Sequence, residues 1–232
     1  MKYIPSIAFD EMSGSAKGVT AAKTRGRKYI RNRGYGGATV STSYQSSVKA
    51  VFKQLSQAWH GLTNSQILAW NAAAGSVQGK SVLGTKSKIT GANLFMRLNF
   101  WVVKCGGTML NNPPTLAGVD APSESTVVLS SSAFTFTLDS VPSVTTNLKL
   151  VIMASAPQSN GITRAYSKAV QIGEVRDIVS TAIDIKSDYE AAHGSVSEGS
   201  PKVFLKYFYV NTVTGEKSGE MLVSAALASS GE

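Results

Sequence analysis

The sequence has very few of the residues that form disulfide bonds and zinc sites. Among its 232 residues, Cys105 is the single cysteine, and His60 and His193 are the only histidines. An internal disulfide bond is therefore excluded, and a Cys/His zinc site cannot be assembled within one chain. Any metal site would have to consist of carboxylates, and we expect neither a metal nor a cofactor.

Long apolar runs are also missing, although the chain is 43% hydrophobic and can bury a core. The longest runs, Leu148–Met153 and Val203–Val210, each contain a lysine and are shorter than the roughly 18 residues that a membrane helix needs. The N-terminus reaches Asp10 and Glu11 before an apolar run of signal-peptide length can form. We therefore expect no membrane contact, and folding in a cytoplasm.

Acidic residues are scarce in the first half of the chain. Residues 1–112 contain fifteen lysines and arginines but only two acidic residues, a net charge of +13. Residues 113–232 contain eight basic and twelve acidic residues, a net charge of −4, so the overall charge of +9 conceals two parts of opposite sign. This asymmetry predicts a boundary near residue 112 and a different electrostatic role for each part.

Residues 1–40 are predicted to form a basic, glycine-rich arm, because they contain little that could build a core. The alternation of residue types in 28–33, between glycines, favours short strands or an extended arm that becomes ordered by pairing with a partner. Six cations within eleven positions are the candidate partner-binding residues. They are Lys23, Arg25, Arg27, Lys28, Arg31 and Arg33.

Residues 41–112 have the periodicity of a small unit of about three helices. Apolar side chains recur every three or four positions from Tyr44 to Trp59, which is typical of one helical face. Thr63 followed by Gln66 predicts a capping box for a second helix. Thr90 is expected to cap a third helix. The segment between the second and third helices, residues 75–91, is predicted to be a flexible loop.

One apolar face is expected on the third helix, formed by Leu94, Phe95, Leu98, Trp101, Val102 and Cys105. We expect Trp59, Trp70 and Trp101 to pack against one another in the core of the helical unit. Each buried large side chain contributes about 1.5–3 kcal/mol, so a unit of this size is marginal alone. Contacts with a partner are expected to complete it.

Residues 113–232 are predicted to form a separate β-rich domain. The segment Asn111–Pro114 has two consecutive prolines, cannot continue a helix and is interpreted as a stiff linker. The β-rich runs that follow are 132–138, 148–154, 179–185, 203–210 and 221–225. About seven strands over such a length is typical of an immunoglobulin- or fibronectin-like β-sandwich. The predicted fold class is therefore α+β, with the arm at 1–40, the helical unit at 41–112 and the sandwich at 113–232.

The segment Ala74–Ser81 matches a relaxed phosphate-loop pattern and would suggest nucleotide binding. A phosphate loop needs a buried strand before it and a helix that begins at its lysine. Here a predicted helix comes before it, and Val82-Leu83-Gly84 interrupts any helix after it. A plain flexible loop is the preferred interpretation.

Four residues that could form an acid/base or metal set lie within ten positions: Asp184, Asp188, Glu190 and His193. Nothing supplies a nucleophile beside them. An exposed acidic turn between two sandwich strands has the same composition and is the preferred interpretation. We therefore predict no catalytic residues and no enzymatic activity.

The basic arm allows three interpretations: a solvated face, a nucleic-acid clamp, or a tether to an acidic protein surface such as a capsid shell. Lysine and arginine bind phosphates, and Tyr29 and Tyr35 could stack on bases, so contact with DNA or RNA stays open. The cations lie in a glycine-rich stretch and not along a recognition helix, which disfavours a sequence-specific regulator.

Several short segments together form a recognisable pattern over about residues 13–114. They are Ser13–Thr20, Arg25–Arg31, Val51-Phe52, Leu55–Trp59, Gly61–Thr63, Gln66, Ala69–Asn71, Thr90-Gly91, Asn93–Phe95 and Leu98-Asn99. This pattern resembles an uncharacterised family of tailed-bacteriophage and prophage proteins. The family has an Asn-Pro segment before its first long helix, where this chain has Ala38–Thr42. Members with a C-terminal immunoglobulin-like module resemble virion components, so the resemblance implies a structural role.

These observations predict a structural protein of a tailed-bacteriophage virion, assembled in the host cytoplasm and present in many copies or as a homo-oligomer. The preferred hypothesis is an auxiliary or decoration protein that binds and cements the capsid shell through its arm and helical unit. One alternative is a subunit of the head-to-tail connector or a tail ring, with portal or ring proteins as partners. A second alternative is a non-specific nucleic-acid-binding protein.

Overall fold

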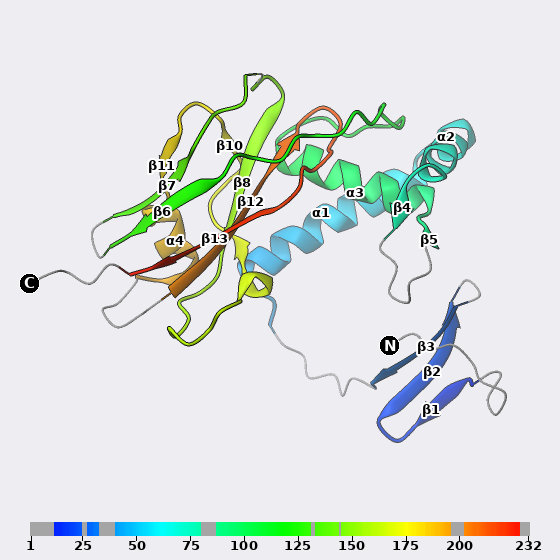
Figure 1. The fold of residues 1–232 in the computed structure, drawn as a ribbon. Helices are drawn as coiled ribbons and strands as arrows, with labels where there is room; N and C mark the ends of the chain where they lie inside the picture. Colours follow the sequence, from blue (N-terminus) through cyan, green and yellow to red (C-terminus); the bar gives the residue numbers. More distant parts are fainter. Residues whose placement is uncertain are drawn as a thin grey trace, which may run out of the picture.

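The computed structural model describes residues 12–24, 27–32, 40–79, 87–130, 133–143, 145–195 and 202–227. Figure 1 shows a mixed fold of helices and antiparallel sheets. The α+β class is confirmed. The division into domains at 1–40, 41–112 and 113–232 stays a prediction.

The N-terminal part is a three-stranded antiparallel sheet, hereafter the β1–β3 sheet. Its strands are β1 (Gly14–Ala16), β2 (Val19–Thr24) and β3 (Arg27–Asn32), in that order. The strands agree with the short strands allowed for the arm. In Figure 1 the sheet lies apart from the rest of the protein. None of its described residues belongs to a core cluster of the chain.

The helical unit has the three predicted helices, with the predicted caps at Thr63 and Thr90 and a further cap at Thr42 that was not predicted. The helices are α1 (Ser43–His60), α2 (Asn64–Ala74) and α3 (Gly91–Lys104). Thr42 and Thr63 each begin a helix with a complete capping box, and the Thr90 hydroxyl accepts a hydrogen bond from the Asn93 amide. These side chains satisfy amides that a helix N-terminus leaves without partners. The segment predicted to be a loop contains a short pair, β4 (Gln78–Gly79) and β5 (Ser87–Lys88).

The tryptophans do not all pack together, so this expectation was wrong. Trp59 and Trp70 both contact Phe95 of α3, with ring centroids 5.4 and 5.3 Å apart. Trp101 instead contacts Phe208, 5.2 Å away, in the β-rich part. Helical residues six positions apart point about 120° away from each other, so Phe95 and Trp101 cannot share one face. Helix α3 therefore has two apolar faces where one was predicted.

The β-rich part consists of two antiparallel sheets that pack across one core. One sheet has the order β11-β7-β6, with β6 (Ser125–Leu129), β7 (Phe134–Leu138) and β11 (Ala182–Asp184). The other has the order β10-β8-β12-β13, with β8 (Leu148–Ala154), β10 (Arg176–Asp177), β12 (Lys202–Asn211) and β13 (Met221–Ala226). A short strand, β9 (Val170–Gln171), also pairs with β8.

Aromatic residues join the two sheets. Phe136 of β7 and Tyr207 of β12 have ring centroids 4.9 Å apart, and both side chains are buried. Phe134 of β7 contacts Tyr189 of α4 (Lys186–His193), a short helix that covers this core. A 3-10 turn, η1 (Tyr166–Lys168), contacts the other face of β12, where the Tyr166 and Phe204 rings are 5.1 Å apart.

The helical unit packs on the outer face of the β10-β8-β12-β13 sheet. Trp101 of α3 and Cys105, the residue that follows α3, contact a small core cluster that includes Val151, Phe208 and Val210. The β12–β13 connection reaches α3 at Gly215, which has a φ of +71° and lies against the Leu98 backbone. The contacts that were expected to complete the helical unit are thus supplied by the chain itself.

The segment that follows α3 is held against the helices. The buried Asn99 side chain accepts a hydrogen bond from the Leu110 amide (2.6 Å) and donates to the carbonyls of Phe95 and Leu110. The Trp70 indole donates to the Asn111 carbonyl at 2.8 Å. These bonds fix the direction in which the chain leaves the helical unit.

We expect Gly215→Ala to destabilise the protein by about 3 kcal/mol or more, because an added Cβ would overlap the Leu98 backbone and the residue has a positive φ. The matched control is Gly106→Ala, whose φ is +79° but whose Cβ would have no neighbour within 4 Å. That variant should lose only about 1 kcal/mol. Urea unfolding followed by tryptophan fluorescence measures both, and equal losses would contradict the contact between Gly215 and α3.

Candidate functional site

The β1–β3 sheet carries the predicted partner-binding residues. Strands β1 and β2 are joined by Lys17 and Gly18, so that Ala16 pairs with Val19 across a two-residue turn. Lys17 has a φ of +46°, as tight hairpin turns require. Strands β2 and β3 pair from Val19 with Asn32 to Thr24 with Arg27.

Four of the six predicted cations lie in described strands. Lys23 of β2 pairs directly with Lys28 of β3, and Arg31 pairs with Thr20. Arg27 pairs with Thr24 at the other end of β3. Arg25 and Arg33 lie outside the described residues.

The sheet distributes its cations over both faces. Because side chains alternate along a strand and paired residues share a face, Lys23 and Lys28 lie on the face of Ile30. Arg31 lies on the opposite face with Tyr29. The sequence alone presents the arm as one basic stretch, because the faces follow only from the register of β2 and β3.

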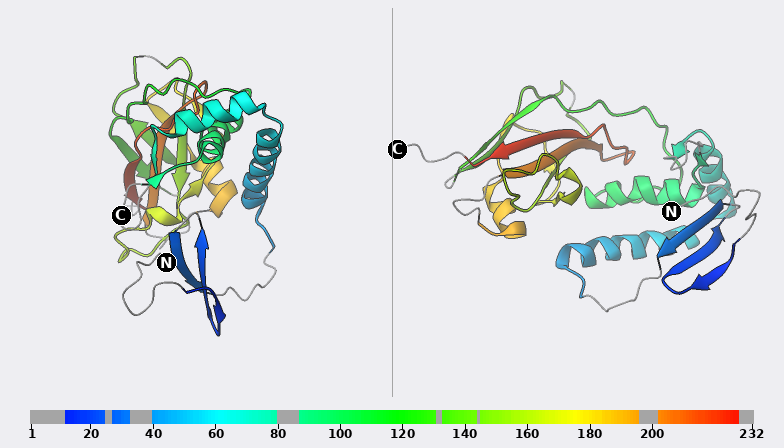
Figure 2. Two further views of the ribbon diagram at one scale, coloured as in Figure 1. Left: turned by 90° about the vertical axis from the view of Figure 1, so that its right-hand side faces the viewer. Right: turned by 60° about the horizontal axis from the view of Figure 1, so that its bottom comes forward.

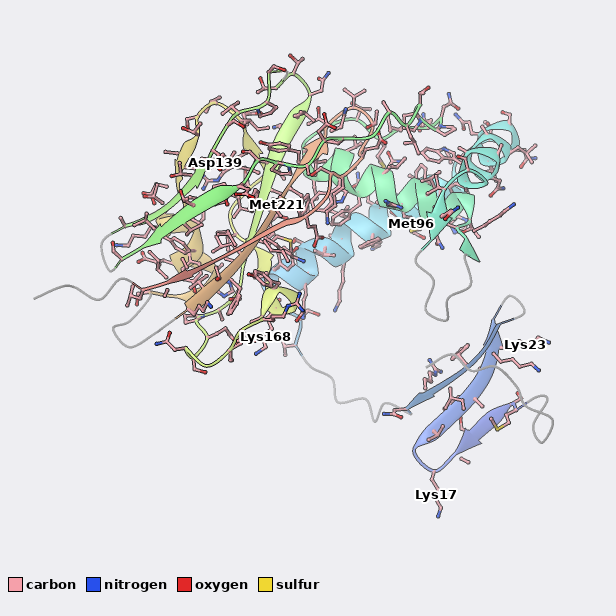
Figure 3. All side chains as sticks on the ribbon, viewed as in Figure 1. Lys17, Lys23, Met96, Asp139, Lys168 and Met221 are labelled. Carbon is pink, nitrogen blue, oxygen red and sulfur yellow. The ribbon has the colours of Figure 1, made fainter. Side chains whose placement is uncertain are left out.

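Lys17 is a further exposed cation of this sheet that sequence analysis did not include. Figure 3 shows its side chain directed away from the hairpin, at the opposite end of the sheet from Lys23. Gly18 is a common second residue of such turns, but lysine is not a usual first residue, so no strong sequence signal identified this position.

The β1–β3 sheet has no buried core of its own. Val19 is 42% exposed, and the described side chains of the sheet are exposed or half-buried. Small sheets need an apolar face packed against another element to be stable alone. No carboxylate occurs in the sequence between Glu11 and Asp120, so neither this sheet nor the helical unit has an acidic side chain within residues 12–119. The arrangement suits an element that is stabilised by a negatively charged partner.

The segment with the phosphate-loop pattern lacks the required geometry. Helix α2 continues to Ala74, and the Gly75 amide caps it by donating to the Ala72 carbonyl. Gln78 and Gly79 then pair with β5. Lys80 and Ser81 lie outside the described residues. A helix thus comes before the pattern where a phosphate loop needs a buried strand.

The acidic segment at 184–193 is not the predicted exposed turn, because Asp184 ends β11 and residues 186–193 form α4. Tyr189 anchors α4 because its side chain is fully buried and its hydroxyl donates to the Ser155 carbonyl at 3.2 Å. Its four candidate residues have separate structural contacts. Asp188 pairs with Arg176, Glu190 lies 3.8 Å from Lys186, Asp184 accepts from the Lys186 amide, and His193 contacts the Ala154 carbonyl. These contacts tie α4 to both sheets.

Two hollows lie where the helical unit meets the sheets. One, of about 660 Å³, separates the start of α1 from β9 and α4, and burial raises the pKa of Tyr44 there. The other, of about 350 Å³, contains Cys105 at the end of α3. Burial is the largest cause that raises the pKa of Cys105, so its thiol is mostly protonated and weakly nucleophilic at neutral pH.

Within the ranges that the structure describes, no three His, Cys, Asp or Glu residues are grouped so that they could hold a metal ion. In the same ranges, no helix has both the length and the apolar character needed to cross a membrane. Comparisons with known protein families, with curated proteins and with solved structures found no match to this chain.

The packing of α4 predicts a loss of stability at high pH. Burial raises the pKa of Tyr189 to about 12, against about 10 in an unfolded chain. The stabilisation from its neutral hydroxyl is therefore complete below about pH 10 and is lost as the pH rises towards about 12. We expect the thermal midpoint to fall across this window.

The control is Tyr189→Phe, which removes one titrating group but keeps the ring against Phe134. Its midpoint should be lower at neutral pH, because the bond to Ser155 is lost, and should fall less steeply above about pH 10. Thermal unfolding followed by circular dichroism measures both slopes. Identical slopes would show that Tyr189 does not titrate in this window.

Proposed function

We propose that this chain is a structural protein of a tailed-bacteriophage virion, and that it is an auxiliary or decoration protein of the capsid shell. The observation that carries the proposal is the pairing of two unlike parts. A cationic sheet without a core of its own is joined to a body in which helices and sandwich pack together. Such a chain is suited to attachment and not to turnover of a small molecule.

We further propose that the β-rich part is an immunoglobulin- or fibronectin-like sandwich. In chain order, β6, β7 and β11 occupy one sheet, as strands A, B and E do in that fold. Strands β8, β12 and β13 occupy the other, as strands C, F and G do. Strand β10 pairs with β8 at the sheet edge, in the place of a C′ strand.

The surface charge supports attachment through the sheet and the helices. Lys49 and Lys53 of α1 and Arg97 of α3 are exposed, and no carboxylate occurs within residues 12–119. An acidic shell would attract both elements, while the net-negative part from residue 113 onward would be directed away from it. Many copies on one lattice would gain avidity that a single weak contact does not provide. The resemblance to phage and prophage proteins supports the same role.

Quantitative mass spectrometry of purified phage particles tests this proposal. We expect on the order of hundreds of copies per particle, as the symmetry of a shell requires. About a dozen copies would instead support a ring subunit of the connector or tail. Absence of the chain from the particles would contradict both assignments.

Binding of the purified chain to particles that lack it tests the role of the β1–β3 sheet. The double variant Lys17→Glu/Arg31→Glu reverses two cations of the sheet, and we expect at least a tenfold loss of affinity, about 1.4 kcal/mol. The control Arg164→Glu/Lys168→Glu makes the same change in charge on exposed residues of the β-rich part. It should bind like the unchanged chain. Equal losses in both variants would exclude the sheet as the attachment element.

Nucleic-acid binding is the second candidate function, because Tyr29 and Arg31 share one face of an antiparallel sheet. An aromatic ring beside a cation can stack on a base and neutralise a phosphate. If this function is correct, labelled single-stranded DNA should bind the isolated chain, and the affinity should fall steeply with salt. Tyr29→Phe should keep the affinity and Tyr29→Ala should lower it. Fluorescence anisotropy measures this, and no binding at low salt would exclude the function.

A further inference from the structure

We infer that the β1–β3 sheet of one copy binds the sandwich of a second copy, at a surface that includes Glu124 and Asp139. The copies would then be linked head to tail. This inference rests on the proposed function, because copies placed side by side on a shell are where such contacts form. In this contact the partner of the sheet is a second copy of this chain, whereas in shell binding the partner is the capsid.

Complementary charge points to a second copy. Apart from Asp10 and Glu11, the carboxylate side chains of the chain lie at residue 120 or later. The β1–β3 sheet has no acidic residue and has Lys17, Lys23 and Arg31 among its exposed side chains. The sandwich of a neighbouring copy therefore offers the opposite charge at the same concentration as the sheet itself.

Most acidic residues of the sandwich are engaged within their own copy. Ion pairs join Asp177 to Lys149, Asp188 to Arg176, Glu190 to Lys186 and Glu220 to Lys217. The Glu216 carboxylate accepts hydrogen bonds from the amides of Ala117 and Gly118. These carboxylates are therefore poorly suited to bind a further cation.

Among the described acidic residues without an ion pair to a described residue, which also include Asp120 and Glu174, Glu124 and Asp139 are the two that lie next to each other. Both are exposed, and neither forms an ion pair with a described residue. They lie side by side where β6 begins and β7 ends, because the Asp139 amide donates to the Glu124 carbonyl at 3.0 Å. Both carboxylates also interact electrostatically with Tyr207. Burial is the largest cause that raises the pKa of Tyr207, and the two negative charges raise it to a smaller degree. The pair forms a local negative surface.

The positions of the two surfaces favour contact between copies over contact within one copy. Figure 3 shows Asp139 on the sandwich and both Lys17 and Lys23 on the separate sheet, with the helical unit between the two regions. The right-hand view of Figure 2 likewise places the sheet and the sandwich at opposite ends of the protein. A contact between two different surfaces is heterologous, so it produces an open chain of copies or a closed ring.

The test is the mass of the purified full-length chain in solution, measured by sedimentation velocity over a range of concentrations. At about 50 mM NaCl we expect the mean mass to rise with concentration. At about 500 mM NaCl the chain should be a monomer, because the Debye length is then only a few ångström. A monomer at both salt concentrations overturns the inference. Salt-dependent compaction without a change in mass also overturns it, because the sheet would then bind its own sandwich.

Two charge-reversed variants identify the surfaces. Lys17→Glu/Arg31→Glu changes the sheet, and Glu124→Lys/Asp139→Lys changes the sandwich. Each alone should associate at least tenfold more weakly, and an equal mixture of the two should regain association because each sheet then meets an opposite charge on the other variant. The control Lys49→Glu/Lys53→Glu on α1 should associate like the unchanged chain. Association that neither variant weakens overturns the inference.

The two proposals can fail separately. A chain that is abundant in particles but monomeric at low salt would retain the proposed function and lose this inference. A chain that associates through the two surfaces but is absent from particles would retain this inference and lose the proposed function. In the particle-binding experiment, Glu124→Lys/Asp139→Lys should still bind the shell, because it leaves the sheet unchanged.

Discussion

The arrangement of this protein depends on helix α3 being buried from two sides. Its Phe95 side packs against Trp59 and Trp70, while its Trp101 side packs on Phe208 of the β10-β8-β12-β13 sheet. Each large side chain removed from water contributes about 1.5–3 kcal/mol, so both contacts matter for a helical unit of this size. Because one helix belongs to both cores, neither part can reorient without exposing apolar surface. The helices and the sandwich therefore form one body although their sequences and charges differ.

The distribution of charge explains why the β1–β3 sheet does not join this body. The helices expose Lys49, Lys53 and Arg97, and the sheet exposes Lys17 and Arg31, with no carboxylate between residues 12 and 119 to pair with any of them. Docking the sheet on the helical unit would bring like charges together and remove them from water, which costs free energy. The separation seen in Figure 1 is what these charges favour. The same charges make both elements available to an acidic surface outside the copy.

Local signals allowed the helices to be predicted well. Threonine caps define where each of the three helices begins, and such caps act through amides only three positions away. Strand β8 was predicted with the observed bounds, and β12 and β13 to within one residue at each end, because their runs are strongly apolar.

Features that depend on distant partners could not be predicted. Strand β6 has an alternating pattern of only five residues, and β9 and β10 have two residues each, so their existence depends on pairing with β7 and β8. Helix α4 was interpreted as a turn because its charged residues hid the anchoring role of Tyr189. The contact between Trp101 and Phe208 joins positions more than a hundred residues apart. For the candidate site, the cations were visible in the sequence, but their faces followed only from the register of β2 and β3.

The composition of the β1–β3 sheet limits how strongly one copy can bind. Val19, Tyr29 and Ile30 are its larger apolar side chains, and full burial of each would contribute at most about 3 kcal/mol. Ordering the sheet and restricting the partner would offset much of that gain. In the proposed assembly, its contacts with a partner would therefore be mainly electrostatic, sensitive to salt and individually weak. A weak contact is useful where many copies are held in a fixed geometry. When one contact breaks, the remaining contacts hold the chain in place, so that the broken contact can form again. This physical requirement for multiplicity, and not any single residue, is the reason why we propose an assembled particle as the partner of the sheet.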